Sequence, residues 1–268
     1  MNLQWLGELD LDPASPWLRM GTRGLGERPW LVTDENTERE LELRTNLMDE
    51  RPDEVVAEPS ASHAAAAELE QLVIGAGVAV ADGPSPLRRL GASIQEDLCL
   101  LERTEAGWIL RAAVLCFPSR WRLGTKLDRP LAAVHGPVEG YATALDAGVT
   151  KLIDRLEDRV VLRRNWFLHP DGALFQPDRP EHDPVVPADR CGTDLFVRSE
   201  RQTLRLLRSS GWCVFTIRIQ QCTVADLARS RRADLQRWLD HVPPSDRNHR
   251  GVPDEQAHEL SGWLAANP

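Results

Sequence analysis

The chain has 268 residues, of which 42% are hydrophobic and 27% charged. This balance is typical of a globular protein, and the length allows one large domain or two small ones. The formal net charge of −9 argues against sequence-independent binding to nucleic acid, which depends on clustered cations. The sequence shows no signal pattern and no run of about 18 apolar residues. We therefore expect a soluble, cytoplasmic protein without a membrane span.

Cysteine and tryptophan are the informative residue types. The five cysteines form no CxxC pair, which favours buried, reduced thiols over a disulfide framework. Nine tryptophans stand against one tyrosine and five phenylalanines. Indole rings suit the walls of a pocket for a planar ligand, but they fill a protein core equally well.

Hydrophobic periodicity predicts a chain that is irregular at first and mixed later. Residues 1–34 are rich in Trp, Pro and Gly and should lie over a core without regular structure. Helical spacing follows, and from residue 94 the pattern changes to that of strands. The predicted helices are 35–50, 61–74, 139–157, 224–239 and 254–265, and the predicted strands are 96–103, 108–117, 160–168, 195–207 and 212–221.

The order of these elements predicts an α+β fold. Hairpins at both ends of the strand series require antiparallel pairing, so the simplest solution is a five-stranded antiparallel sheet with helices on one face. A central helical segment that crosses such a sheet is the PAS arrangement, which leaves a pocket beneath the crossing segment. We expect one compact domain, divided into an N-terminal cover (1–93), a PAS-like core (94–222) and C-terminal helices (223–268).

Residues 126–141 contain the histidine with the most constrained setting. His135 follows an apolar run and precedes a Gly-Pro turn that opens the central helical segment. Neutral imidazole is a good ligand for a metal or for haem iron. A buried or helix-capping histidine explains the same pattern, and the residues alone favour that structural reading.

The predicted strand 195–207 is unusually charged. Period two places Arg198, Glu200 and Gln202 on one face and Ser199, Arg201 and Thr203 on the other. Charges on a central strand are costly when they are buried without partners. Either the face is solvated, or the charges pair with each other or with a ligand.

Several segments together resemble the haem-dependent oxidative N-demethylases, specifically proteins similar to their alpha subunit. The matching pieces occur in the family's order over roughly residues 17–221. They are Met20-Gly21, Trp30-Leu31, QEDLCL (95–100), CFPSRW (116–121), Lys126-Leu127, PLAAVHGPV (130–138), Arg164-Asn165-Trp166, RSERQTL (198–204) and FTIR (215–218). Glu139 departs from the family's usual proline, and residues 247–251 match only loosely.

The resemblance implies a PAS-like fold that holds haem b. It also implies a monooxygenase that removes an N-alkyl group from a small secondary or N-methylated amine as an aldehyde. Such a reaction uses dioxygen and electrons from a separate flavin or iron–sulfur reductase, because this chain has neither a flavin nor an iron–sulfur fingerprint. A haem-PAS sensor and a haem-free metabolite-binding protein remain alternatives from other functional classes.

The resemblance also directs the choice of site residues. His135 becomes the expected iron ligand, and we expect Glu200 to accept a hydrogen bond from a protonated amine while Arg201 or Arg218 fixes its orientation. A structural ion-pair network explains the same charges. The expected haem contacts, for which surface exposure or core packing is the alternative, are Arg120, Trp121, Arg122, Lys126, Arg164, Trp166 and Arg198.

A possible partner surface lies on the predicted helix 224–239. Arg229, Arg231 and Arg232 make a local basic patch in an otherwise acidic protein. Such a patch would suit an acidic redox partner, and a solvated helix face is the alternative.

Overall fold

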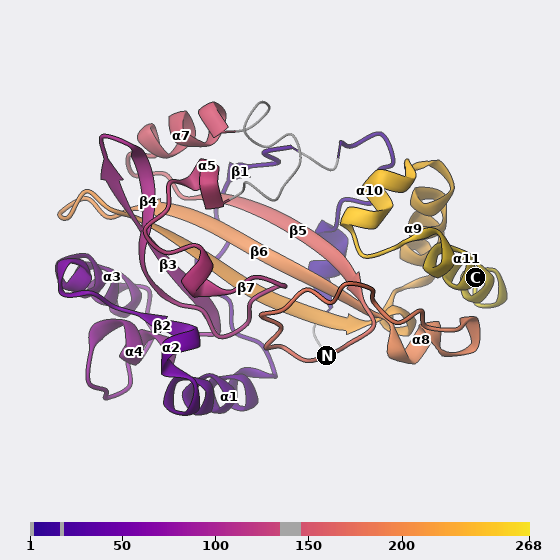
Figure 1. Ribbon diagram of the computed structural model, residues 1–268, viewed down its shortest axis with the longest axis horizontal. Helices are drawn as coiled ribbons and strands as arrows, with labels where there is room; N and C mark the ends of the chain where they lie inside the picture. The colour runs from indigo at the N-terminus through magenta and orange to yellow at the C-terminus, as the bar shows by residue number, and fades with distance from the viewer. Residues whose placement is uncertain (1–2, 17–18, 135–145) are drawn as a thin grey trace.

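The computed structural model describes residues 3–16, 19–134 and 146–268. In these residues an antiparallel sheet is surrounded by helices, which makes the fold α+β (Figure 1). The strands are β1 (Arg23–Gly24), β2 (Val56–Ala57), β3 (Glu96–Thr104), β4 (Gly107–Val114), β5 (Val161–His169), β6 (Phe196–Leu206) and β7 (Cys213–Thr223). The helices are α1 (Thr37–Glu50), α2 (Pro52–Val55), α3 (His63–Gly75), α4 (Pro86–Gly91), α5 (Leu131–Val134), α7 (Asp146–Asp154), α8 (Cys191–Asp194), α9 (Arg229–His241), α10 (Pro244–His249) and α11 (Asp254–Ala266).

The sheet has seven strands in the order β1-β5-β6-β7-β3-β4-β2, and every neighbouring pair is antiparallel. Its five long strands, β3 to β7, confirm the five predicted strands to within a few residues. The predicted strand number was nevertheless wrong. The two-residue strands β1 and β2 extend the outer edges, and so short a strand carries no period-two pattern for a sequence to reveal.

The helix predictions were confirmed where the helical periodicity of apolar residues extends over a long segment. The predicted helices 35–50, 61–74 and 254–265 correspond to α1, α3 and α11, and α9 accounts for most of 224–239. The six-residue helices α4 and α10 were missed, because each is little longer than one turn and begins with proline. Helix α7 covers the later part of the predicted helix 139–157, whose residues 139–145 lie outside the described ones.

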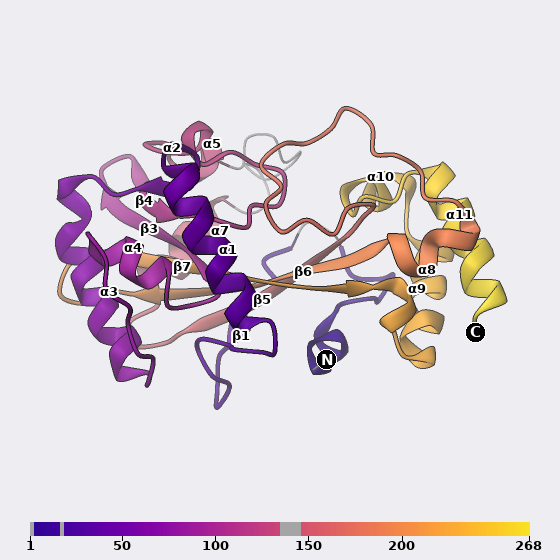
Figure 2. The ribbon, with the colours of Figure 1, turned by 90° about the horizontal axis from the view of Figure 1, so that it is seen from below.

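Strands β5, β6 and β7 run the length of the molecule and connect two hydrophobic cores. At one end, α3 and α4 pack against β3, β4 and β7; at the other end, α8, α9 and α11 enclose the second core (Figures 1 and 2). No helix in the described part of the chain is long and apolar enough to cross a membrane.

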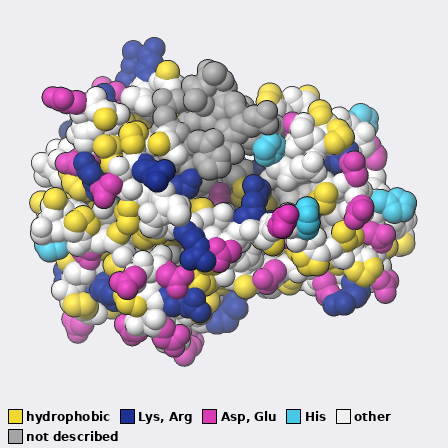
Figure 3. Space-filling view, in the orientation of Figure 1, with side chains coloured by type: hydrophobic (Ala, Val, Ile, Leu, Met, Phe, Trp, Pro, Cys, Tyr) yellow, Lys and Arg dark blue, Asp and Glu magenta, His cyan; other side chains and the backbone are white. Residues whose placement is uncertain are grey.

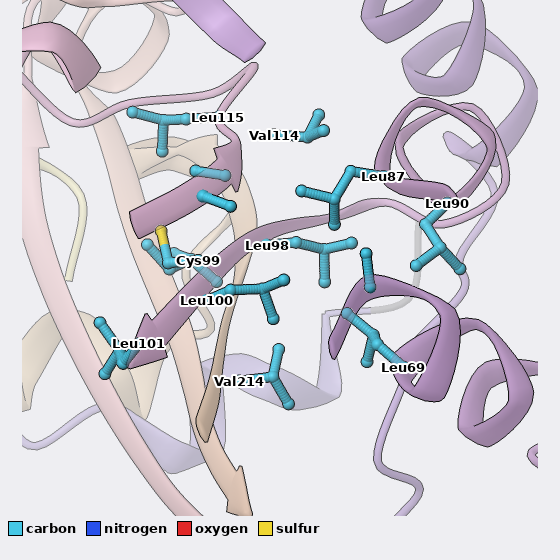
Figure 4. Packing of buried hydrophobic residues seen from close by; sticks show 14 of the residues in the cluster. Leu69, Leu87, Leu90, Leu98, Cys99, Leu100, Leu101, Val114, Leu115 and Val214 are labelled. Atoms are coloured by element: carbon cyan, nitrogen blue, oxygen red, sulfur yellow. The ribbon is translucent and has the colours of Figure 1, made fainter. Parts of the chain in front are cut away.

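The main core shows how the strand period sorts side chains between the two faces. Leu98 and Leu100 point toward Leu69 of α3 and the leucines of α4, whereas Cys99 and Leu101 point the other way (Figure 4). Helix α7 lies on that second face, since its Asp154 accepts a 2.9 Å hydrogen bond from Trp108 and pairs with Arg103. Helices therefore cover both faces, which corrects the expectation of one helical face.

The fully buried Leu69 should be a stability determinant. We expect Leu69→Ala to lower the free energy of unfolding by about 2–5 kcal/mol, because it removes buried methyl groups and leaves a cavity. Ile74 on the same helix is 47% exposed, so Ile74→Ala should change it by less than about 0.5 kcal/mol. Urea denaturation measures both, and equal effects would contradict this packing.

Candidate functional site

The RSERQT motif lies in β6 at the centre of the sheet, between β5 and β7. The residues alternate as period two predicted: Arg198, Glu200 and Gln202 share one face, and Arg201 and Thr203 share the other. Arg198, Glu200 and Arg201 have exposed fractions of only 0%, 7% and 4%. The charged face is therefore not solvated, and each of these groups needs a partner.

Three arginines form a row across the sheet on the Arg201 face. In the strand register, Arg164 of β5 stands opposite Arg201 of β6, and Arg201 stands opposite Arg218 of β7. Directly opposed like charges destabilise a sheet unless other groups compensate them. We call these residues the arginine row.

Carboxylates from the N-terminal third of the chain compensate one end of the row. Arg218 is fully buried and pairs with Asp34 at 2.6 Å and with Glu40 of α1 at 2.8 Å. Burial is the main cause that raises the pKa of Glu40, and Arg218 partly offsets it. The pairing is the structural ion-pair network that the sequence left open as the alternative to catalysis.

Backbone carbonyls and one further carboxylate compensate the rest of the row. Arg201 donates hydrogen bonds to the carbonyls of Pro29 and Trp30 at 2.5 and 2.8 Å. Arg164 donates to Glu8 at 3.2 Å, and burial is the main cause that lowers its pKa to about 10. Each arginine of the row thus has a partner in the N-terminal segment, and Arg164 also donates to Ser199 and Gln220 within the sheet.

This geometry separates the arginine row from Glu200. Arg201 and Arg218 were expected to orient Glu200, but they lie on the opposite face and bind other partners. Arg164 shares that opposite face, so it does not face a ligand held beside Glu200.

Trp166 also lies on the face away from Glu200. It is 1% exposed, its ring contacts Trp238 at 4.9 Å in an edge-to-face arrangement, and its Nε1 donates to the Asp10 carbonyl. Trp166 is thus a member of the second hydrophobic core, the alternative that the sequence allowed.

Glu200 has few compensating groups. Gln202 donates a 2.8 Å hydrogen bond to its Oε2, and this is the one side-chain bond to Glu200 within the described part of the chain. Its register neighbours are Asn165 on β5 and the buried Ile219 on β7. Arg198 and Arg250 interact with Glu200 electrostatically but donate no hydrogen bond to it.

Arg198 forms hydrogen bonds to two loops that lie over the Glu200 face. Its Nη2 donates to the carbonyls of Phe117, Pro118 and Leu174 at 3.0–3.2 Å. Its Nη1 donates to Ala173 and its Nε to Ser119. Burial is the main cause that lowers the Arg198 pKa, to about 10. Arg198 was expected to contact haem, but these bonds give it a structural role.

We call the two loops that Arg198 joins, residues 117–125 and 170–183, the strap. Arg120 pairs with Asp183 through two 2.5 Å hydrogen bonds, and Arg122 pairs with Asp178 through two of 2.6 Å. Both arginines were expected to bind haem propionates. In the structure they bind carboxylates that connect one loop of the strap to the other.

Trp121 and Lys126 are the remaining predicted haem contacts within the described residues. Trp121 is half-buried and packs against the main core. Burial is the main cause that lowers the pKa of Lys126, and repulsion from Arg129 adds to it. The molecular surface is hollowed near the residues drawn in grey, with positively charged side chains at the margin (Figure 3). His135, the predicted iron ligand, lies outside the described residues.

Metal-ligating side chains are scarce elsewhere. The described part of the chain holds no group of three His, Cys, Asp or Glu side chains that could bind a metal. All five cysteines are buried, and burial raises the pKa of their thiols, for example to about 12 for Cys116. In the absence of a metal, a thiol with so high a pKa is protonated at neutral pH.

His169 is the buried histidine of the described chain, at 2% exposure. Its Nδ1 lies 2.8 Å from Oε1 of Gln176, whose amide nitrogen donates to two strap carbonyls. That orientation makes Nδ1 the donor. Burial, with help from Arg120 and Arg198, lowers its pKa to about 3.

Two structural residues were missed by the sequence reasoning. Asp97 accepts hydrogen bonds from the buried Arg44 and from the backbone of Cys116 and Phe117, which fixes the start of the strap. An acidic residue inside an apolar strand was the available signal. Arg250, in the loosely matching segment, bonds Asn165 and the Trp166 carbonyl.

The predicted basic patch on α9 is largely engaged within the protein. Arg231 pairs with Asp234 and donates to the Leu9 carbonyl. Arg232 donates to the carbonyls of Ala225 and Leu227. Two of the three arginines are thus used in structure, which weakens the expectation of a partner surface here.

The fold and the site define an α+β protein with a buried carboxylate on one sheet face, beneath a strap. A family model described as haem-dependent oxidative N-demethylase, alpha subunit-like, matches residues 75–257. This match covers more than half of the sequence, so the chain belongs to that family, and the resemblance noted from the sequence is confirmed. A search of curated proteins found no match.

The strap should depend on the guanidinium of Arg198. We expect Arg198→Lys to lower the free energy of unfolding by about 3–5 kcal/mol, since an ammonium cannot reach all the buried carbonyls. Arg122→Lys, at an exposed pair, should cost less than about 1 kcal/mol. Urea denaturation and hydrogen exchange of residues 117–119 compare them, and unchanged exchange in Arg198→Lys would contradict the role of Arg198.

His169 should make the protein sensitive to acid. The unfolded chain binds a proton near the ordinary pKa of 6.5, whereas the folded chain binds it only near 3. Below about pH 6.5 the unfolded state therefore holds more protons, and stability should fall by about 1.4 kcal/mol per pH unit.

Replacement of His169 tests this dependence. Denaturation between pH 7 and pH 4 should show a shallower loss of stability in His169→Gln than in the wild type. His63→Gln, at an exposed position, serves as the control and should leave the slope unchanged. Parallel slopes for wild type and His169→Gln would exclude His169 as the source.

Proposed function

We propose that this chain is a haem-dependent oxidative N-demethylase-like monooxygenase of a small secondary or N-methylated amine. One observation supports the proposal: among the described residues, Glu200 is the buried carboxylate to which no charged group and no backbone N–H donates a hydrogen bond. Of the four buried Asp and Glu side chains in the described part of the chain, Glu40 and Asp97 pair with arginine, and Glu96 accepts a backbone N–H. Glu200 accepts a bond from Gln202 alone among the described residues.

The described residues offer groups of the kinds that haem proteins use. Ile217 and Ile219 are buried apolar side chains of β7, and Lys126 is a partly buried cation at the start of the segment that leads to His135. We assign iron ligation to His135, which lies outside the described residues, because the family resemblance includes the segment PLAAVHGPV and imidazole is a common haem ligand.

The topology supports a PAS-like assignment as part of this proposal. Numbered along the chain, the five long strands stand in the order third, fourth, fifth, first, second. The segment between the second and third of them contains α5, His135 and α7. In the proposed PAS-like assignment, this segment takes the place of the crossing segment.

In this proposal, haem and the residues of the chain have separate roles. Haem, when bound, supplies the activation of dioxygen, with electrons from a separate flavin or iron–sulfur reductase. Glu200 binds the N–H of the protonated amine, and Gln202 fixes the rotamer of Glu200 through Oε2. Ile219 and the strap limit access of water, which strengthens this charge interaction.

The absorption spectrum of protein purified with added haem tests the cofactor. We expect a Soret band, and we expect His135→Ala to change the coordination state that the band reports. His169→Gln is the matched control and should leave the spectrum unaltered. A protein without a Soret band would exclude both the monooxygenase and a haem-PAS sensor, and would leave a haem-free binding protein.

Amine oxidation tests the role of Glu200. With reduced haem protein, dioxygen and dimethylamine, Glu200→Gln should lower kcat/KM for formaldehyde release by at least about 30-fold. Loss of one partner of a buried charge pair costs about 2 kcal/mol or more. Glu255→Gln, at an exposed site on α11, is the control. Haem binding without formaldehyde from any methylamine would favour the sensor.

A further inference from the structure

Three arginines surround one carboxylate on the face away from Glu200. Glu8, at the end of the N-terminal 3-10 helix Gln4–Glu8, lies 2.9 Å from Arg23 and 3.2 Å from Arg164 through Oε2. Its Oε1 lies 4.0 Å from Arg28. We call Arg23, Arg28 and Arg164 the arginine cradle. Its members come from β1, the loop after β1, and β5.

The cradle holds more positive charge than Glu8 neutralises. Three guanidinium groups less one carboxylate leave two positive charges, and these arginines have no other carboxylate partner within the described chain. Arg201 lies behind them, and its charge repels those of Arg23 and Arg28. Burial is the main cause that lowers the pKa of Arg201, and Arg28 and Arg23 lower it further. Such an excess is notable in a chain of net charge −9.

Access to the cradle is open on one side. The side chains of Arg23 and Arg28 are 45% and 47% exposed, and Glu8 is 32% exposed, whereas Arg164 is 5% exposed. The cradle therefore has a buried floor and a solvated rim. A guanidinium presents a planar pair of donors that suits carboxylate or phosphate oxygens.

Glu8 can leave the cradle while its helix stays in place. Trp5 and Leu6 of the same short helix are buried in the second core. The following residues are held by Arg231, which donates to the Leu9 carbonyl, and by Trp166, which donates to the Asp10 carbonyl. Rotation of one partly exposed side chain is therefore sufficient to remove the carboxylate from all three guanidinium groups, while Arg164 keeps its hydrogen bonds to Ser199 and Gln220.

We propose that the arginine cradle is an anion-binding site in which Glu8 is a displaceable internal ligand and a small dianion of the phosphate class is the external one. A dianion matches the two positive charges that Glu8 leaves uncompensated. It gains charge-assisted hydrogen bonds from several guanidinium groups at once. The site is separate from Glu200 and does not depend on haem or on amine oxidation.

Inorganic phosphate is the probe, titrated into the full chain by calorimetry and thermal denaturation at constant ionic strength, with chloride as the reference anion. Glu8→Gln removes the carboxylate charge from three guanidinium groups, so we expect it to bind phosphate at least about tenfold more tightly than the wild type. The double variant Arg23→Gln/Arg28→Gln should lose this binding. Arg103→Gln/Arg208→Gln, at exposed ion pairs elsewhere, should retain the wild-type affinity.

Two outcomes would overturn the proposal. Phosphate that stabilises Glu8→Gln no more than chloride does would show that the cradle serves only to hold Glu8. Equal phosphate affinity in Arg23→Gln/Arg28→Gln and in the wild type would place the binding elsewhere. Circular dichroism spectra that match the wild type establish that each variant is folded.

Discussion

The arginine row across β5, β6 and β7 is the constraint on which the rest of the structure depends. Three opposed guanidinium groups on a covered face are stable only if other chain segments bring oxygen atoms to them. Asp34, Glu40 and Glu8 bring carboxylates, and all three precede the family-matched region 75–257. The N-terminal segment is therefore part of the folded unit, because without it the row would face water or remain unpaired.

The first residues of β3 connect this network to the opposite side of the molecule. Gln95 bonds Asp34 and Glu40, and Glu96 accepts the backbone N–H of Val32. Asp97 faces the other way and binds Arg44 and the start of the strap. Burial raises the pKa of Glu40 and Glu96, so each is costly as an anion, and the nearby Arg218 offsets part of that cost. Three consecutive polar residues thus organise both faces.

The sequence predicted the long strands and the two faces of β6 because period two is a local property. Beyond the two hairpins, it could not predict which strands lie side by side, and the register of β5 against β6 decides the role of Arg164 and Trp166. Nor could it predict the partners of Arg198, which are mainly backbone carbonyls of the strap, distant in sequence. Every residue has a backbone carbonyl oxygen, so no residue type in the sequence identifies the ones that Arg198 binds. Glu200 was chosen on its charge, and the register adds its apolar neighbour Ile219.

The two faces of β6 differ in how completely their charges are compensated. On one face, Arg201 donates hydrogen bonds to backbone carbonyls, and Arg218 pairs with carboxylates. On the other, Arg198 satisfies backbone oxygen atoms and forms no ion pair in the described chain, although Glu200 follows two residues later. Arg198 and Arg250 interact with Glu200 electrostatically, but neither donates a hydrogen bond to it. Because the strap uses the donors of Arg198, Gln202 is the side-chain hydrogen-bond partner of Glu200 within the described chain. The same arginine thus holds the strap over a carboxylate to which it donates no hydrogen bond.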